Sequence, residues 1–151
     1  MVIMTIQELS SAADRSLVEK AWVDALSNKN IDELVNLHSE DVVLHDPTLP
    51  KSLKGQSELR GLIEGLYRMF PDYRVSKVRS FGHGEWVCLE AEETGTMKGP
   101  IHGLGGHMVQ PTGKSFKIQS SIVCRTAGGK ISEVRIYYDV LGLMGQLGLR
   151  P

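Results

Sequence analysis

Apolar residues recur every three or four positions in the first part of the chain, the pattern of amphipathic helices. The stripe from Leu9 to Leu26 predicts a helix that ends near Ser27. The segment Thr5-Ile6-Gln7-Glu8 reads as the capping box that opens it. Residues 30–37 predict a second, shorter helix, with Asn30 as its cap. The chain therefore begins with a helical region.

A third apolar face, from Leu59 to Phe70, predicts a helix that Pro71 ends. After Pro71 the spacing of apolar positions changes from the helical period to the alternation of strands. We predict strands at 41–45, 73–81, 86–97, 114–125 and 130–138, and a last short helix at 140–147. Helices followed by hairpin-linked strands indicate an α+β fold with an antiparallel sheet.

The length and element order predict a single domain, residues 1–151. A curved antiparallel sheet wrapped over three N-terminal helices forms a cone, and its open end is a pocket suited to a small ligand. Three helices cover only one face of such a sheet. The other face stays partly bare, which predicts a homodimer.

Charge and composition exclude several classes of protein. The chain has 17 Lys+Arg and 18 Asp+Glu, a formal net charge of -1, which argues against nucleic-acid and anionic-membrane binding. No apolar run approaches the roughly 20 residues of a membrane helix, and the first residues lack a secretory signal, so we expect a cytoplasmic protein. The two cysteines form no disulfide framework, and no Cys/His spacing fits zinc. We predict neither a metal nor a cofactor.

Two stretches carry a resemblance to a known family. The tail 137–148 (YYDVLGLMGQLG), with Pro111-Thr112-Gly113-Lys114 and Gly129-Lys130-Ile131, resembles the SnoaL-like polyketide cyclase (ester cyclase) family. That family belongs to the nuclear-transport-factor-2-like superfamily of cone-shaped, cystatin-like α+β domains. Residues 30–32, 41–47 and Gly55 are similar to ketosteroid isomerases of the same superfamily. The resemblance implies a small, mostly apolar carbonyl substrate and no cofactor.

Asp46 is the first catalytic candidate. In the related isomerases the Asp before Pro at the end of the first strand moves the substrate proton, and Asp46 precedes Pro47 in that position. A base beside a dry pocket can remove a proton next to a carbonyl if donors stabilise the enolate oxygen. The competing interpretation is an Asx turn before Pro47. By strand alternation His45 points to the opposite face, as a structural or interface residue.

The resemblance also implies two donors for the enolate oxygen. Alignment of the helices puts Trp22 at the isomerase tyrosine position, and alignment on Arg125 puts Gln119, to within one residue, at the carboxylic acid position. An indole N–H and an amide NH₂ are neutral donors that could serve there. The alternatives are a core aromatic for Trp22 and an outward strand residue for Gln119.

Further candidates would line the pocket. Alternation along residues 86–97 puts Glu93 and Met97 on the inward face, and Met97 stands where the resemblance implies the cyclase His. Tyr138 on the last strand could reach the pocket with its hydroxyl, and His102 in the glycine-rich segment could fold back into it. A solvated edge for Glu93 and a surface loop for His102 are the alternatives. We expect Asp139 to cap the last helix.

Two functions remain open. The first is a cofactor-independent isomerase, cyclase or lyase that acts on a small apolar carbonyl compound, with Asp46 as base. The second is a non-catalytic module of the same fold that binds a small hydrophobic ligand or supports a dimer. The second gains weight because Met97 replaces the cyclase His and residues 114–125 contain no Asp or Glu.

Overall fold

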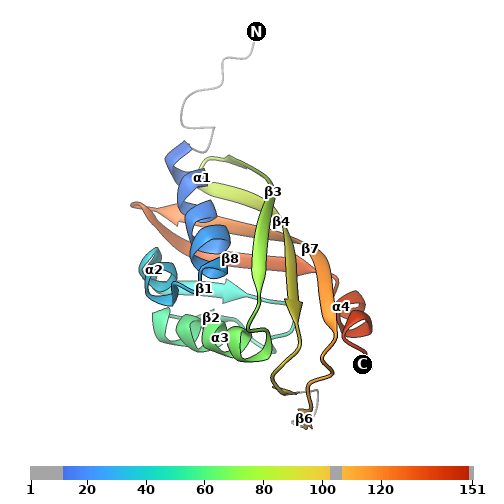
Figure 1. Ribbon diagram of the computed structural model, residues 1–151. Coiled ribbons are helices and arrows are strands. Elements are labelled where there is room, and N and C mark those ends of the chain that lie inside the picture. The colour runs from blue at the N-terminus through green and yellow to red at the C-terminus, as the bar shows by residue number, and fades with distance from the viewer. Residues whose placement is uncertain (1–11, 103–106, 150–151) are drawn as a thin grey trace.

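The computed structural model describes residues 12–102 and 107–149 (Figure 1), so the expected capping box lies outside the described residues. Five helical segments are present in these ranges: α1 (Ala12–Glu19), the π-helical η1 (Lys20–Ala25), α2 (Ile31–Asn36), α3 (Gln56–Met69) and α4 (Val140–Gln146). Both predicted caps that fall here are confirmed. Asn30 Oδ1 accepts from the Glu33 N–H at 3.2 Å, and Asp139 Oδ1 accepts from the Gly142 N–H at 2.8 Å. No helix of the described ranges is long and apolar enough to span a membrane.

A six-stranded sheet in the order β2-β1-β8-β7-β4-β3 forms the second layer. Its strands are β1 (His38–His45), β2 (Leu53–Lys54), β3 (Arg74–His83), β4 (Trp86–Thr96), β7 (Ser115–Ala127) and β8 (Lys130–Tyr138). The short β5 (Ile101–His102) and β6 (Met108–Val109) pair separately. The α+β prediction is confirmed, but the sheet is mixed, not wholly antiparallel. The first and last long strands, β1 and β8, lie side by side and run parallel.

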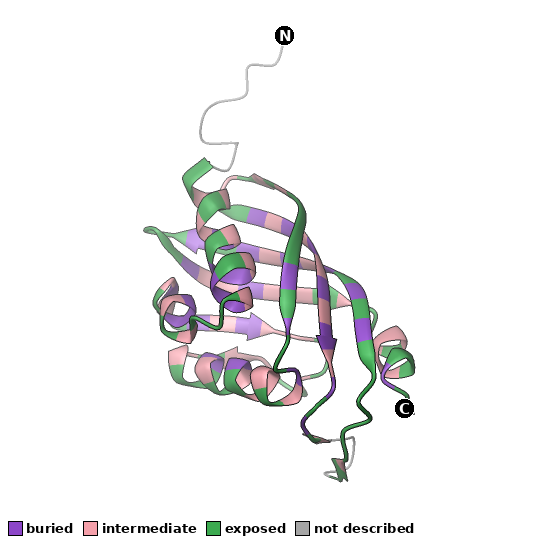
Figure 2. Cartoon of the chain, in the orientation of Figure 1, coloured by how far each residue is buried: buried purple, intermediate pink, exposed green. Residues whose placement is uncertain are grey.

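The helices α1, α2 and α3 cover one face of this curved sheet (Figure 1), with contacts from α1 to β3, β4 and β8 and from α2 and α3 to β1. Burial alternates along β4 and β7 (Figure 2), as expected for strands with one face on a core. Val87, Leu89, Ala91 and Glu93 are the buried positions of β4 up to Glu93, which confirms the predicted inward face of this strand. We call the helix-covered side the inner face and the other side the outer face.

The chain that follows β4 is held against the C-terminal end of α3. The backbone N–H groups of Lys98 and Gly99 both donate to the Met69 carbonyl oxygen, at 2.9 and 3.2 Å. A Cβ atom at Gly99 would lie 2.1 Å from the Arg68 carbonyl oxygen, well inside van der Waals contact. The approach of these two backbones therefore requires glycine at this position.

Helix α4 packs against β7 beyond the end of β8. The last paired residue of β8, Tyr138, lies opposite Ser120, so the stretch of β7 before Ser120 has β4 as its strand neighbour and, among residues 12–102 and 107–149, no strand on the other side. Gln146 of α4 reaches this stretch. Its Oε1 accepts from the Lys117 N–H at 2.7 Å, and its Nε2 donates to the Lys117 carbonyl oxygen at 3.1 Å.

Candidate functional site

Five polar residues lie on a diagonal across the inner face, where the sheet register places them. Tyr138 on β8 is paired with Ser120 on β7, and Ser120 is paired with Ala91 on β4. Glu93 is two residues further along β4 on the same face, and Tyr73 immediately precedes β3, two residues before Val75, the partner of Glu93. At the other end Asp46 follows His45, the last residue of β1. We call these residues, Asp46, Tyr138, Ser120, Glu93 and Tyr73, the inner polar row.

Glu93 and Tyr73 form a buried carboxyl–phenol pair. The Tyr73 hydroxyl donates to Glu93 Oε1 at 2.5 Å, and the two residues are only 6% exposed each. Burial raises the pKa of Glu93, and the charge of Asp46 adds to the effect, while hydrogen bonding from Tyr73 and Ser120 opposes it. Burial and the neighbouring Glu93 also raise the pKa of Tyr73. The surroundings of the Glu93 carboxyl therefore favour its neutral form.

Asp46 and Tyr138 form a second carboxyl–phenol pair nearer the surface. Asp46 Oδ1 accepts from the Thr48 N–H at 2.8 Å and from the Thr48 hydroxyl at 2.6 Å, which is an Asx turn. The Tyr138 hydroxyl is hydrogen-bonded to Asp46 and also contacts Thr48. Burial, followed by the charge of Asp46, raises the pKa of Tyr138. Asp46 thus forms the Asx turn and is also a member of the inner polar row, so the two interpretations are compatible.

The indole N–H of Trp22 is hydrogen-bonded to a residue outside the inner polar row. Its indole N–H donates to His38 Nε2 at 3.2 Å, and the two rings meet edge to face with centroids 5.5 Å apart. His38 is fully buried, and its Nδ1 lies 2.7 Å from the Leu34 carbonyl oxygen. Trp22 is therefore a core aromatic residue, which is the alternative given for it above, and its N–H is already hydrogen-bonded to His38. The sequence analysis did not single out His38.

Gln119 does not lie where the resemblance implied, whereas Met97 lies on the expected side of the sheet. Gln119 is on the outer face, where its Nε2 donates to Glu92 Oε2 at 3.1 Å, because strand alternation turns it away from its neighbour Ser120. Met97 points inward as expected but is fully buried in the hydrophobic core, with the Thr112 hydroxyl 3.6 Å from its sulfur. The backbone of His102 belongs to β5, and its side chain lies outside the described residues.

Aromatic side chains of the core pack around the Tyr73 end of the row. The rings of Phe70, Tyr73 and Phe116 pack against one another, edge to face or tilted, with centroids 4.9 to 6.5 Å apart. Two surface cavities lie elsewhere. One of about 130 Å³ is on the outer face, lined by Glu90, Gln119, Ser120, Ser121 and Tyr137. One of about 690 Å³ lies at the start of β1, lined by Asn36, His38, Ser39, Glu40, Asp41, Gln56 and Lys130. At the Tyr73 end of the row, aromatic side chains thus lie where the sequence analysis expected an open hollow.

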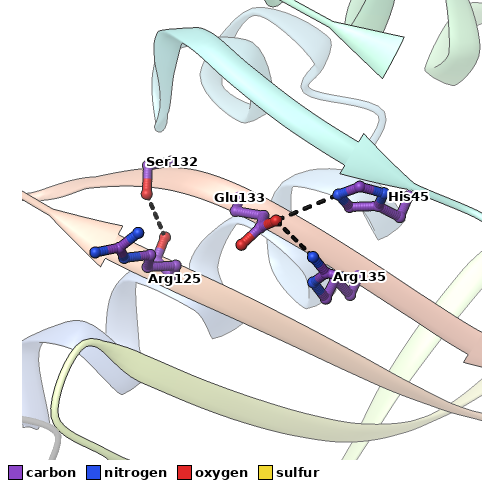
Figure 3. Close-up of polar contacts among 5 residues, drawn as sticks. All are labelled: His45, Arg125, Ser132, Glu133 and Arg135. Carbon is purple, nitrogen blue, oxygen red and sulfur yellow. Dashed lines mark hydrogen bonds and ion pairs between the residues drawn. The ribbon is translucent and has the colours of Figure 1, made fainter. Parts of the chain in front are cut away.

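The outer face carries its own polar contacts (Figure 3). Glu133 Oε1 lies 3.2 Å from His45 Nε2 and 3.0 Å from a terminal guanidinium nitrogen of Arg135. His45 is paired with Arg135 across β1 and β8, so the two side chains leave the sheet on the same side. This confirms the expectation that His45 faces away from the inner side. Among the described residues, no group of three or more His, Cys, Asp or Glu side chains could hold a metal ion.

Tyr73 and Ser120 were missed by the sequence analysis. Tyr73 stood at the start of a predicted strand, and the alternation of that strand with buried Val75 could have placed it inward. Ser120 differs from the predicted Gln119 by one residue, within the stated uncertainty of the alignment. A shift of one residue along a strand exchanges the inner face for the outer one.

A model of the SnoaL-like polyketide cyclase family matches residues 16–147. The chain belongs to this family. No curated protein matches the SnoaL-like chain. Among solved structures, a protein from Jannaschia sp. CCS1 assigned as a SnoaL-like polyketide cyclase is similar with a TM-score of 0.81 and 18% identity, and the similarity covers 100% of both chains. TsrD from Streptomyces laurentii is similar with a TM-score of 0.78 and 20% identity over 95% of this chain and 100% of that one.

A third similar structure has a ketosteroid isomerase-like fold and comes from Catenulispora acidiphila DSM 44928. Its TM-score is 0.73 and its identity 22%, over 89% of the SnoaL-like chain and 93% of the other, and it was solved in complex with trimethylamine. At these identities the likeness establishes the fold, because this architecture supports many unrelated activities.

Proposed function

We propose that this SnoaL-like chain is a cofactor-independent enzyme that moves a proton on a small, mostly apolar carbonyl compound, as an isomerase, cyclase or lyase. The observation that carries the proposal is the inner polar row, in which two carboxyl groups of unequal burial lie close enough for the charge of one to raise the pKa of the other. Unequal environments of this kind divide acid and base roles between two carboxyl groups. The family membership supports the same class of reaction.

Asp46 is the base in this proposal, and Glu93 is the acid. The half-exposed Asp46 carboxylate takes a proton from the carbon next to the substrate carbonyl, and the electron pair moves onto the carbonyl oxygen. The neutral Glu93 carboxyl donates a hydrogen bond to that oxygen, and Tyr73 holds Glu93 in place through its own hydroxyl. Protonated Asp46 then returns the proton to the same or a conjugated carbon. Tyr138 and Thr48 orient Asp46 throughout.

The exchange of α-protons with solvent tests whether Asp46 transfers a proton, and it requires no knowledge of the natural substrate. Incubation of the protein with α-tetralone in D₂O, followed by proton NMR, should show loss of the α-proton signal faster than in buffer. Asp46→Asn should reduce the protein-dependent rate by about 100-fold or more, the usual size of a general-base contribution. Asp41→Asn is the matched control, because Asp41 is exposed on β1, the strand that Asp46 directly follows. Equal exchange rates in wild type and Asp46→Asn would exclude Asp46 as the base.

The second candidate function is a non-catalytic module of the same fold that binds a small ligand. The packed rings at the Tyr73 end of the row and the Asx turn at Asp46 favour this function, since both arrangements are complete without any substrate. The similar structure that was solved with trimethylamine supports a small apolar or cationic ligand for such a module. Binding of such a ligand with no α-proton exchange in the wild type would favour this candidate.

A second copy of the chain is the proposed partner of the outer face. Phe81, Trp86 and Tyr137 are large apolar side chains exposed there, 52%, 37% and 55% respectively. Paired charges of both signs surround them, including Arg79 with Glu90 and Arg135 with Glu133. A face of this kind can match a copy of itself through a two-fold axis. Light scattering should then give twice the chain mass of 16.7 kDa, and a monomer at tens of micromolar would contradict the proposal.

A further inference from the structure

The larger of the two surface cavities described above lies at the start of β1, which separates it from the inner polar row. Its volume of about 690 Å³ is within the range of cavities that hold small molecules. Asp46 follows the other end of the same strand, so this cavity and the row lie at opposite ends of β1. We call it the β1 cavity. Its lining is polar throughout, with the residues Asn36, His38, Ser39, Glu40, Asp41, Gln56 and Lys130.

A bulge in β1 forms one wall of the cavity. Between the pairs that β1 makes with Ile131 and Glu133 of β8, residues 39–42 of β1 stand opposite a single residue of β8. A bulge redirects side chains out of the regular alternation of a strand, and bulges are frequent beside active sites. Three of the bulged residues, 39–41, line the β1 cavity. The irregular path of the chain therefore brings these three residues to the cavity.

Other lining residues are held by hydrogen bonds within the protein. Gln56 Nε2 donates to the carbonyl oxygens of Val35 and His38, at 3.3 and 2.9 Å, so both of its N–H groups are used. The ammonium group of Lys130 donates to the Asn36 carbonyl oxygen at the end of α2. Gln56 therefore offers a ligand its acceptor oxygen Oε1, on an amide that these two bonds fix in place.

The side chains of the bulge, in contrast, lack partners. The Oγ atom of Ser39 is buried, and the described parts of the chain give it no hydrogen-bond partner. Buried hydroxyl groups in folded proteins are nearly always paired, so this one indicates a partner that the chain itself does not supply. The carboxyl groups of Glu40 and Asp41 make no ion pair or hydrogen bond with residues 12–102 or 107–149. Together with Lys130 they give the lining two negative charges and one positive charge.

We propose that the β1 cavity binds a small organic cation that carries several hydroxyl groups. Its ammonium group is attracted by Glu40 and Asp41, and its hydroxyl groups bond to Ser39 and to Gln56 Oε1. A wholly polar lining does not suit an apolar ligand, and the excess of negative charge disfavours an anion. A cavity of this volume is also far larger than a metal ion requires.

This inference does not depend on the proposed function. The β1 cavity takes no part in the reaction proposed for the inner polar row, so Asp41→Asn remains a control for proton exchange. Loss of α-proton exchange in Asp46→Asn would leave the inference unchanged, and failure of the β1 cavity to bind a cation would leave the reaction unchanged.

Two matched probes test the proposal. N-Methylglucamine is a polyhydroxylated cation at pH 7, and sorbitol has the same carbon chain with an uncharged hydroxyl in place of the methylammonium group. Protein-observed NMR titration measures the affinity of each, and the side-chain amide signals of Asn36 and Gln56 report binding in the cavity. The variants are Glu40→Gln and Ser39→Ala. Glu64→Gln is the matched control, because Glu64 is exposed on α3 outside the cavity.

We expect the wild type to bind N-methylglucamine more tightly than sorbitol. Glu40→Gln should weaken N-methylglucamine binding by about two- to fivefold, the size of an exposed ion pair, and should leave sorbitol binding unchanged. Ser39→Ala should weaken both probes by about two- to tenfold, because it removes one hydrogen bond to a hydroxyl group. Glu64→Gln should change neither affinity.

Four results would contradict the proposal. Equal affinities of the wild type for the two probes would overturn the cationic class of the ligand. Absence of binding, or binding that leaves the Asn36 and Gln56 amide signals unshifted, would overturn the site. Wild-type affinities in Ser39→Ala would overturn the hydroxyl contact. A shift of the same amide signals by Ca²⁺ at lower concentration than by N-methylglucamine would assign the cavity to a metal ion instead. Thermal unfolding of each variant shows that the fold is retained.

Discussion

The buried pair of Trp22 and His38 makes folding stability depend on pH. In the neutral ring, Nδ1–H donates to the Leu34 carbonyl oxygen and Nε2 accepts from the Trp22 N–H. A proton added to Nε2 would point at that N–H, and the charged ring would be buried. Burial lowers the pKa of His38 from 6.5 to about 4, with the charge of Lys130 as a smaller contribution and the Leu34 hydrogen bond opposing both. The folded protein therefore keeps this ring neutral.

The size of the effect follows from the two pKa values. In the unfolded chain His38 takes up a proton below its ordinary pKa of 6.5, whereas in the folded protein it does so only near pH 4. The unfolded state thus binds more protons in this window, and the free energy of unfolding decreases as the pH falls. The loss is about 2 kcal/mol by pH 5 and about 3 kcal/mol when both states are protonated. Above pH 7 the contribution is fully present.

The assay is urea unfolding of wild type and His38→Gln at several pH values between 7.5 and 5. Glutamine does not titrate, so His38→Gln should be less stable than wild type at pH 7.5, and the difference should shrink by about 2 kcal/mol at pH 5. Other ionisable groups affect both proteins and cancel in the difference. His83→Gln, at an exposed position of β3, should keep the wild-type pH dependence. A difference between wild type and His38→Gln that stays constant over this range would refute the reasoning.

Two glycine substitutions should have effects of opposite sign. Gly99→Ala should lower the midpoint of thermal unfolding, because its Cβ would lie 2.1 Å from the Arg68 carbonyl oxygen and would separate the chain after β4 from the end of α3. A midpoint at or above that of wild type would show that the two backbones do not need this approach. Gly61→Ala should instead raise stability by about 0.5–1 kcal/mol, because Gly61 lies inside α3 with no atom within 4 Å of its Cβ position. Thermal unfolding of both variants, followed by circular dichroism, measures the two effects. Destabilisation by Gly61→Ala would contradict the expectation that alanine is more favourable than glycine inside α3.

Local signals in the sequence predicted the elements well, because each is determined by neighbouring residues. The side-chain hydrogen bonds of Asn30 and Asp139 were predicted from residue type and position alone. The inward face of β4 followed from alternation of side chains. These features require only a few consecutive residues, so no long-range information was needed.

Features that join distant segments were not predictable in the same way. The parallel pairing of β1 with β8 brings His45 beside Arg135, ninety positions later, and nothing in either segment specifies the other. The partner of the Trp22 N–H is similarly remote, since His38 lies beyond the next helix. Gln119 was predicted in place of Ser120 because the alignment was uncertain by one residue. Along a strand, one residue decides whether a side chain faces the core or the solvent.

The contact between Gln146 and Lys117 affects how the protein meets other chains. A strand edge with free N–H and carbonyl groups is a template for strands of other molecules. The side-chain amide of Gln146 imitates a peptide group and occupies both positions of Lys117 at this edge. Loss of this amide, or of helix α4, which carries it, would leave this segment of β7 open to strands of other molecules. The resistance of the protein to aggregation therefore depends in part on α4, which lies away from the candidate site.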